Sequence, residues 1–67
     1  MFTQRETEVL ELILRGFTNE KIAENLNISK HTVKAHKDNI FRKLEVSNSV
    51  QAAVKYLRMK SVARIEE

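Results

Sequence analysis

The chain contains no proline and a single glycine, so few of its residues oppose continuous helix. Its apolar residues recur three and four positions apart, which is the spacing that lines one face of an α-helix. Residue types that cap helix amino ends stand before four such stretches. The pattern predicts an all-α fold of four helices joined by short turns, near residues 4–15, 19–26, 30–44 and 48–59.

Each predicted helix has a candidate cap and a candidate core stripe. The caps are Thr3, with Glu6 completing a capping box, then Thr18, Ser29, and either Ser47 or Ser49. The core stripes are Val9, Leu10, Ile13, Leu14 and Phe17; Ile22, Ala23 and Leu26; Val33, His36, Ile40 and Leu44; and Val50, Ala53, Val54 and Leu57. Gly16 is placed to end the first helix in a left-handed conformation. A second, weaker apolar stripe on the last helix (Ala52, Tyr56 and Met59) is either core or an exposed patch for a second copy.

Length and composition narrow the possible functions. The chain, residues 1–67, is long enough for one domain and leaves little room for an enclosed catalytic cavity. It has no cysteine, and His31 and His36 are five positions apart rather than the four that place two ligands on one helical face. No serine, histidine and acid are arranged for nucleophilic catalysis. We therefore expect no enzyme activity, no metal and no cofactor.

Nothing in the sequence points to a membrane. No apolar run approaches the roughly 20 residues that a spanning helix needs. The amino end does not resemble a secretion signal. The expected compartment is therefore the cytoplasm.

Positive charge is concentrated in one segment. The net charge is +3, a modest excess for a chain of this size. Residues 30–43 hold five Lys or Arg against one Asp, whereas residues 1–29 hold three Lys or Arg against five Glu. Such a local excess is the electrostatic footprint expected of a surface that binds phosphate groups.

Residues 18–44 have the pattern of a helix-turn-helix: a short helix, a tight turn and a longer helix. Ala23 is small enough for the two helices to cross closely, Ile28 supplies an apolar residue in the turn, and Val33 anchors the longer helix. The opposite face of that helix is polar and basic, and it carries His31, Lys34, Ala35, Asp38 and Arg42. The free N–H groups near Ser29 suit a phosphate.

Specific residues make the chain similar to the LuxR/GerE family of helix-turn-helix domains. They are Thr3-Gln4-Arg5-Glu6-Thr7-Glu8-Val9-Leu10, Gly16, Ile22-Ala23, Leu26, Ile28-Ser29, Thr32-Val33-Lys34, His36, Ile40, Lys43-Leu44, Val46 and Ala53-Val54. The resemblance covers roughly residues 2 to 59. It implies sequence-selective binding of double-stranded DNA in bacterial transcription regulation, as in response regulators and quorum-sensing regulators. It further implies that the third helix enters the major groove, and that dimers form through the fourth helix.

The resemblance also suggests roles for single residues. Lys34 and Ala35 would face base edges, whereas Lys30, Thr32 and Lys37 would approach the DNA backbone. The full set of expected DNA contacts is Lys30, His31, Thr32, Lys34, Ala35, Lys37, Asp38 and Arg42. The expected homodimer contact is the stripe of Ala52, Tyr56 and Met59, and RNA polymerase is a further expected partner. His36 lies on the inward side, so we interpret it as a structural histidine.

Two residues depart from the family pattern, and two other functions are compatible with parts of the sequence. Asp38 is acidic where a neutral or basic residue is common, and Ser49 replaces a frequent arginine. Asp38 either reads a cytosine amino group or simply lowers non-specific affinity. The other functions are the promoter-recognition domain of a sigma factor, which the stretch from Arg5 to Ser29 also resembles, and a helix-turn-helix protein adaptor. Residues 32–36 and the fourth helix argue against the first, and the basic third helix argues against the second.

Overall fold

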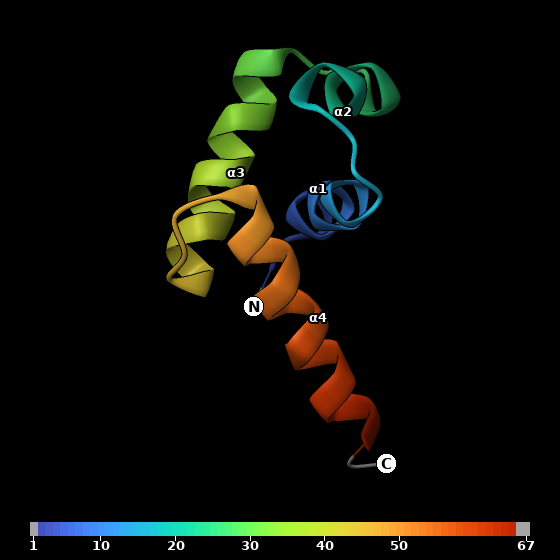
Figure 1. Ribbon diagram of the computed structural model, residues 1–67. Helices are drawn as coiled ribbons and strands as arrows, with labels where there is room; N and C mark the ends of the chain where they lie inside the picture. Colours follow the sequence, from blue (N-terminus) through green and yellow to red (C-terminus); the bar gives the residue numbers. More distant parts are fainter. Residues whose placement is uncertain (1, 66–67) are drawn as a thin grey trace.

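The computed structural model describes residues 2–65, with side chains described through Ser61. Its helices are α1 (Gln4–Leu14), α2 (Asn19–Leu26), α3 (Lys30–Leu44) and α4 (Ser49–Ile65), and all regular structure in residues 2–65 is helical (Figure 1). The all-α, four-helix prediction is thereby confirmed. The last helix is longer than expected, because it continues past residue 59 to Ile65. No proline or glycine in that stretch interrupts it.

Local side-chain chemistry fixes where the first three helices begin. The Glu6 N–H donates to Thr3 Oγ1 at 3.0 Å and the Thr3 N–H donates to Glu6 Oε1 at 2.9 Å, which completes the predicted capping box. Thr18 and Ser29 also serve as caps, as expected. Gly16 follows α1 with a φ of +83°, a conformation that side chains on other L-residues oppose.

The cap of α4 differs from the prediction of Ser47 or Ser49. Asn48 takes this role: its Oδ1 accepts from the Gln51 N–H at 2.9 Å. The Gln51 side chain reaches back, and its Oε1 accepts from the Ser47 N–H at 2.9 Å. Asparagine satisfies the first free N–H groups of a helix as well as serine does, so three adjacent polar residues offered equivalent candidates.

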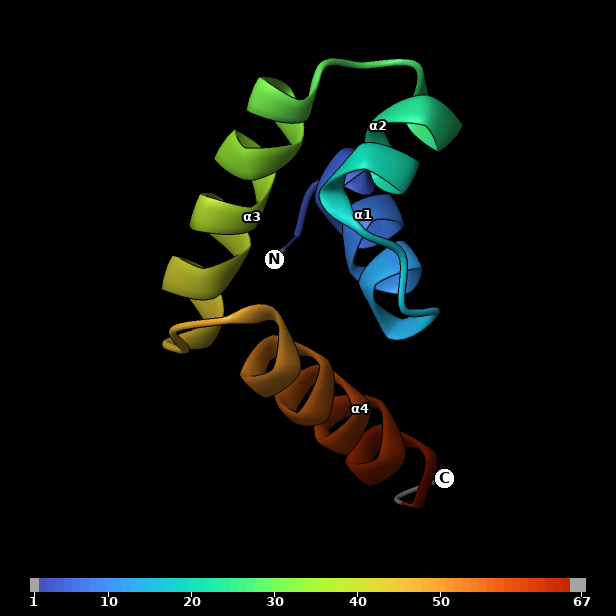
Figure 2. The same ribbon diagram turned by 45° about the horizontal axis from the view of Figure 1, so that its top comes forward.

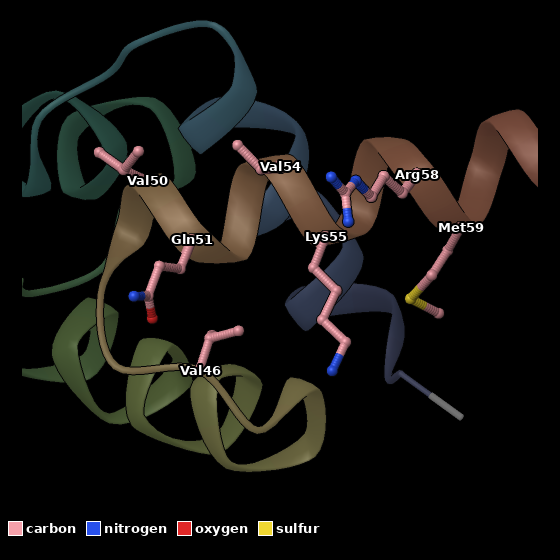
Figure 3. A pocket seen from close by; sticks show the side chains of 7 residues that line it. All are labelled: Val46, Val50, Gln51, Val54, Lys55, Arg58 and Met59. Atoms are coloured by element: carbon pink, nitrogen blue, oxygen red, sulfur yellow. The ribbon is translucent and has the colours of Figure 1, made fainter.

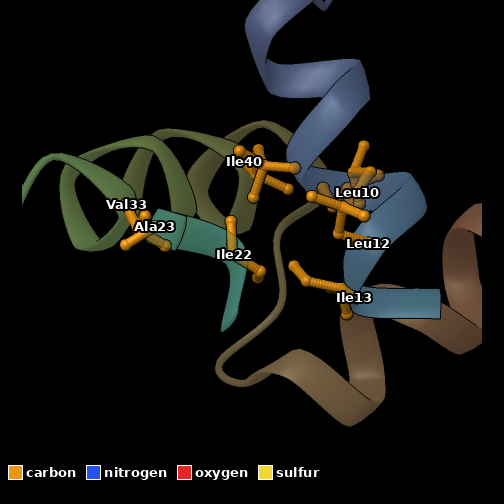
Figure 4. Close-up of a cluster of buried hydrophobic side chains, with 10 residues drawn as sticks. Leu10, Leu12, Ile13, Ile22, Ala23, Val33 and Ile40 are labelled. Atoms are coloured by element: carbon orange, nitrogen blue, oxygen red, sulfur yellow. The ribbon is translucent and has the colours of Figure 1, made fainter. Parts of the chain in front are cut away.

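The core forms where α1, α2 and α3 meet, and the amino end of α4 closes it (Figure 2). Leu10 and Ile13 from α1, Ile22 from α2 and Ile40 from α3 are directed toward one another (Figure 4). The buried apolar residues are Val9, Leu10, Leu12, Ile13, Ile22, Ala23, Val33, Ile40, Leu44 and Ala52. The predicted core stripes of the first three helices are largely confirmed, although Leu14, Phe17, Leu26 and His36 are only partly buried and Leu12 was missed.

The predicted inner face of α4 is wrong except at Ala53, which is partly buried against the core. Val50, Val54 and Leu57 are 73%, 48% and 53% exposed, whereas Ala52, expected to be available to a second copy, is completely buried. Tyr56 is half-buried against α1, where its hydroxyl donates to Glu11 Oε2 at 3.1 Å. The helix is therefore turned so that Ala52 and Tyr56 of its weaker apolar stripe face the core, while Met59 is exposed.

Polar contacts hold α4 against α1. Lys60 Nζ lies 3.1 Å from Glu11 Oε2 and 5.2 Å from the centre of the Tyr56 ring. The Lys60 hydrogen bond, ahead of that from Tyr56, keeps the pKa of Glu11 below its ordinary value. Burial and the Glu11 carboxylate raise the pKa of Tyr56. These contacts need Tyr56 on the inner side of α4, which explains why Val54 and Leu57 are left outside.

A second polar contact joins α3 to α1. Lys43 Nζ, near the carboxyl end of α3, donates to Glu6 Oε1 at 2.7 Å, and Glu6 is only 4% exposed. The Lys43 hydrogen bond, helped by the Thr3 N–H, keeps the pKa of Glu6 below its ordinary value of 4.5 despite burial.

We expect Glu6→Gln to weaken the acid dependence of folding stability. The carboxylate's contribution is present above the unfolded-state pKa and is lost as the pH falls through the lower folded-state pKa. Near neutral pH the variant loses the ion pair but keeps a capping side chain, so we expect a loss of about 1 kcal/mol, or about 4–8 °C in Tm. Thermal melts between pH 6 and pH 3 test this. Glu8→Gln, at a partly exposed position, is the control, and an unchanged acid dependence in Glu6→Gln would contradict the prediction.

None of the helices in residues 2–65 is both long and apolar enough to cross a membrane.

Candidate nucleic-acid interface

The turn between α2 and α3 has three residues and is closed by backbone hydrogen bonds. Asn27 takes a left-handed conformation, with φ 58° and ψ 47°, and its short polar side chain tolerates this better than most. The Ile28 N–H then donates to the Ala23 carbonyl at 3.0 Å, which draws Ile28 back against the core. Ala23 is buried at this crossing, as the sequence predicted. Residues 18–44 thus form a helix-turn-helix.

The two faces of α3 differ sharply. Val33, Ile40 and Leu44 are buried, and they fix the rotation of the helix about its own axis. The predicted outward residues are His31, Lys34, Ala35, Asp38 and Arg42, and all five are exposed. The helix lies along one edge of the molecule (Figures 1 and 2). The exposed side chains therefore share one face of a helix whose opposite face is buried in the core.

The amino end of α3 is partly capped and remains electropositive. Ser29 Oγ accepts from the Thr32 N–H at 3.0 Å and lies 2.9 Å from the Thr32 hydroxyl. The N–H groups of the first turn before Thr32 have no partner within the helix, so they carry the positive end of the helix dipole. Lys30 is exposed nearby, with Nζ 3.8 Å from Glu20 Oε2. Both of these side chains are well solvated, so the pair restrains Lys30 only weakly.

Lys37 differs from the other lysines of α3 because it is half-buried on the side that faces α2. Its Nζ donates to Asn19 Oδ1 at 2.5 Å, in the first turn of α2. Burial lowers the pKa of Lys37. The ammonium group has three hydrogens, so this bond leaves others available at the amino end of α2. Asn19 was not among the residues that the sequence singled out. Its place directly after the Thr18 cap could have indicated it, because the first helix of a helix-turn-helix crosses the DNA backbone.

The basic segment divides between two sides of α3. Lys43 lies on the α1 side, where it pairs with Glu6 and lies 5.8 Å from the centre of the Phe2 ring. His36 is half-buried on the same side, where it helps to lower the pKa of Glu6. Lys34 and Arg42 lie on the outward side, where the guanidinium Nη1 of Arg42 is 3.3 Å from Asn39 Oδ1. Only part of the charge counted in the sequence is therefore available on the outward face.

The other prominent surface is an apolar groove along α4 (Figure 3). It has a volume of about 730 Å³ and is lined by Val46, Val50, Gln51, Val54, Lys55, Arg58 and Met59. Lys55 Nζ donates to the Leu44 carbonyl at 2.6 Å and so joins α4 to the end of α3. Of the expected dimer residues only Met59, 39% exposed, borders this groove; Ala52 and Tyr56 face the core.

Among the described residues, no three His, Cys, Asp or Glu side chains gather to hold a metal ion.

Comparison with known proteins assigns this arrangement to a family. Residues 1–56 match the family of bacterial regulatory proteins described as the luxR family. The chain is 46% identical over 52 residues to the HTH-type transcriptional regulator MalT of Vibrio campbellii, which covers 78% of this chain and 6% of MalT. It is 46% identical over 54 residues to the response regulator protein VraR of Staphylococcus aureus, which covers 81% of this chain and 26% of VraR.

A solved structure of the transcription factor GerE superposes on 88% of this chain and 88% of its own, with a TM-score of 0.81 and 37% identity. The chain thus spans nearly all of GerE but only a small part of MalT and VraR. The resemblance seen in the sequence is confirmed. The chain belongs to the luxR family of bacterial regulatory proteins, which are transcription regulators and not enzymes.

Proposed function

We propose that this domain binds double-stranded DNA selectively, with α3 in the major groove, as the DNA-reading part of a bacterial transcription regulator. The observation that carries the proposal is the outward face of α3, where five adjacent side chains are exposed on a helix whose rotation is fixed by a buried stripe. A helix of this kind fits the major groove, where base edges differ from one another. The names of its relatives, a transcriptional regulator and a transcription factor, support the same function.

The proposed contacts fall into two groups. Lys34 and Ala35 face base edges, and Asp38 and Arg42 continue the same face one and two turns further along the helix. Lys30, His31 and Thr32 lie around the amino end of α3, where a backbone phosphate would meet both the helix dipole and a positive side chain. Lys37 joins this second group through the hydrogens that Asn19 leaves unused. Backbone contacts of this kind set position and affinity, whereas the first group sets sequence preference.

We also propose that two copies pair on DNA through α4, by a different face from the one that the sequence suggested. Val50, Val54 and Leu57 are exposed at positions i, i+4 and i+7, which makes a continuous apolar stripe, and Val50 and Val54 also line the groove. One stripe on one helix buries too little area for a strong dimer in solution, so the contact depends on DNA bringing two copies together. Contact with RNA polymerase and a cytoplasmic location stay predictions from the sequence.

We expect Lys34→Ala to weaken binding to the selected site by about 1–3 kcal/mol and to relax the preference at one base position. Lys34 is exposed on the groove-facing side, where its ammonium can donate to guanine. The site is first obtained by selection from random duplexes, and binding is then titrated on selected and random DNA. Arg15→Ala removes one positive charge outside α3 and should leave base preference unchanged. An equal loss on both kinds of DNA in Lys34→Ala would mean that Lys34 contacts only phosphate.

A further inference from the structure

We propose that Asp38 determines sequence specificity by selecting cytosine at one position of each DNA site. The inference rests on the proposed function, because it requires the outward face of α3 to lie in the major groove. It gives a specific role to Asp38, whose charge opposes DNA binding in general and favours only one kind of base.

The position of Asp38 places it among the proposed base contacts. Its side chain is exposed on the outward face of α3, one turn after Lys34 and one turn before Arg42. Ala35 lies beside it on the same face and is too small to keep a base edge at a distance. The carboxylate is thus carried on a rigid helix, with room for close approach.

Asp38 has no structural task in the described part of the chain. Glu6, Glu8, Glu11 and Glu20 each lie within 4 Å of a lysine or arginine, but no such ion pair is found for Asp38. Arg42, at the spacing that favours a pair with Asp38, instead directs its Nη1 to Asn39 Oδ1. Nor does Asp38 cap the helix, because it lies in the interior of α3, where aspartate is a poor helix former. The fold does not account for an acid at this position.

The major groove gives a carboxylate one good partner. An ionised carboxylate only accepts hydrogen bonds, so it needs a donor. Guanine presents two acceptors and thymine presents an acceptor and a methyl group, so both would repel or exclude it. Adenine presents its amino donor beside the N7 acceptor, whereas cytosine presents an amino donor with no acceptor next to it on the same base. Cytosine is therefore the base that Asp38 fits.

The flanking cations make an acid tolerable on this surface. Lys34 and Arg42 lie on either side of Asp38 along the helix, so the face as a whole stays positive toward the phosphates. A sequence without cytosine at the matching position leaves the carboxylate desolvated and unpaired, which lowers affinity for such DNA. Asp38 thus discriminates both by a contact with the right base and by a penalty on the others.

The test compares sites selected from random duplexes by the wild-type domain and by two variants, followed by titrations on matched duplexes. For the wild type we expect cytosine at one position per site, with about tenfold weaker binding when it is replaced. Asp38→Ala should reduce that factor to less than about twofold and leave the other positions selected as before. Asp38→Asn should shift the preference toward adenine, because an amide can both donate and accept at the adenine edge.

The control is Glu24→Gln, which removes one negative charge from an exposed position on α2. It should raise affinity for all duplexes alike and keep the cytosine preference. If Asp38→Ala does the same, raising affinity uniformly while cytosine is still selected, Asp38 acts only as a general charge and the inference is overturned. The wild type could also select a clear site without a cytosine preference, or with one that does not depend on Asp38. In either case the inference fails while the proposed function stands. A wild-type domain that selects no sequence would refute the proposed function itself.

Discussion

Replacing Val33 with aspartate is expected to unfold the domain. Val33 has no exposed surface and is the residue through which the first half of α3 packs on the core. An unpaired carboxylate at this point costs several kcal/mol, either as buried charge or as the work of protonating it. A chain of this length has a total folding stability of about 3–10 kcal/mol, so the substitution removes most or all of it.

Circular dichroism and thermal melting measure this directly. Val33→Asp should show little helix at 25 °C and no cooperative transition. Ala35→Asp is the matched control, because it introduces the same side chain two positions away on the same helix, at an exposed site. It should remain folded and lose no more than about 0.7 kcal/mol, which is the helix-propensity difference between alanine and aspartate. A Val33→Asp protein that melts like the wild type would show that Val33 is not part of the core in solution.

Val54→Glu is expected to abolish cooperative binding to a duplex that carries two half-sites. Val54 lies in the middle of the exposed stripe on α4, and a two-fold contact between copies would bring two introduced carboxylates close together. Half-sites about one helical turn apart hold two copies side by side, which raises their effective concentration and makes even a weak contact measurable. We expect the wild type to bind the second half-site tenfold or more tightly than the first, and Val54→Glu to bind both equally.

Titrations on one-site and two-site duplexes give the result. Affinity for a single half-site should be nearly unchanged in Val54→Glu, because residue 54 lies on α4 and outside the proposed DNA contacts. Asn25→Glu adds the same charge on an exposed part of α2 and should keep full cooperativity. Cooperativity that survives in both Val54→Glu and Leu57→Glu, with folding intact, would exclude this stripe as the interface.

Tyr56→Glu would test the α4 surface only if Tyr56 were exposed. Because Tyr56 packs against α1, the substitution tests folding stability instead. The Tyr56 hydroxyl donates to Glu11, and its ring meets the Phe2 ring edge-on at 6.2 Å between centres. Glutamate at this position would lose the ring contact and place two carboxylates together, so we expect a less stable fold. Loss of cooperativity in that variant would carry no information about the surface of α4.

The sequence determined those features that depend on neighbours along the chain. Thr3, Thr18 and Ser29 cap the N–H groups three residues later, and Gly16 adopts a conformation that its own lack of a side chain permits. The two faces of α3 were also predictable, because Val33, Ile40 and Leu44 form one strong apolar stripe and the rest of the helix is polar. A helix with a single apolar face can be buried in only one orientation. The exposed set on α3 followed from that alone.

The tertiary structure decided which of several equivalent local choices was used. Lys37 and Lys43 turn toward Asn19 and Glu6, residues that are 18 and 37 positions away in the chain. Such long-range partners leave no trace in local spacing, so the charge count for α3 overstated what its outward face presents.

The orientation of α4 depended most strongly on tertiary contacts. This helix has two apolar stripes, and burial of apolar surface is non-directional, so either stripe satisfies the hydrophobic effect. Ala52 is small enough to sit fully buried where α4 meets the core, and Tyr56 and Lys60 both reach Glu11 across the contact with α1. Those polar bonds can form in only one rotation of the helix. They leave the larger residues Val54 and Leu57 exposed.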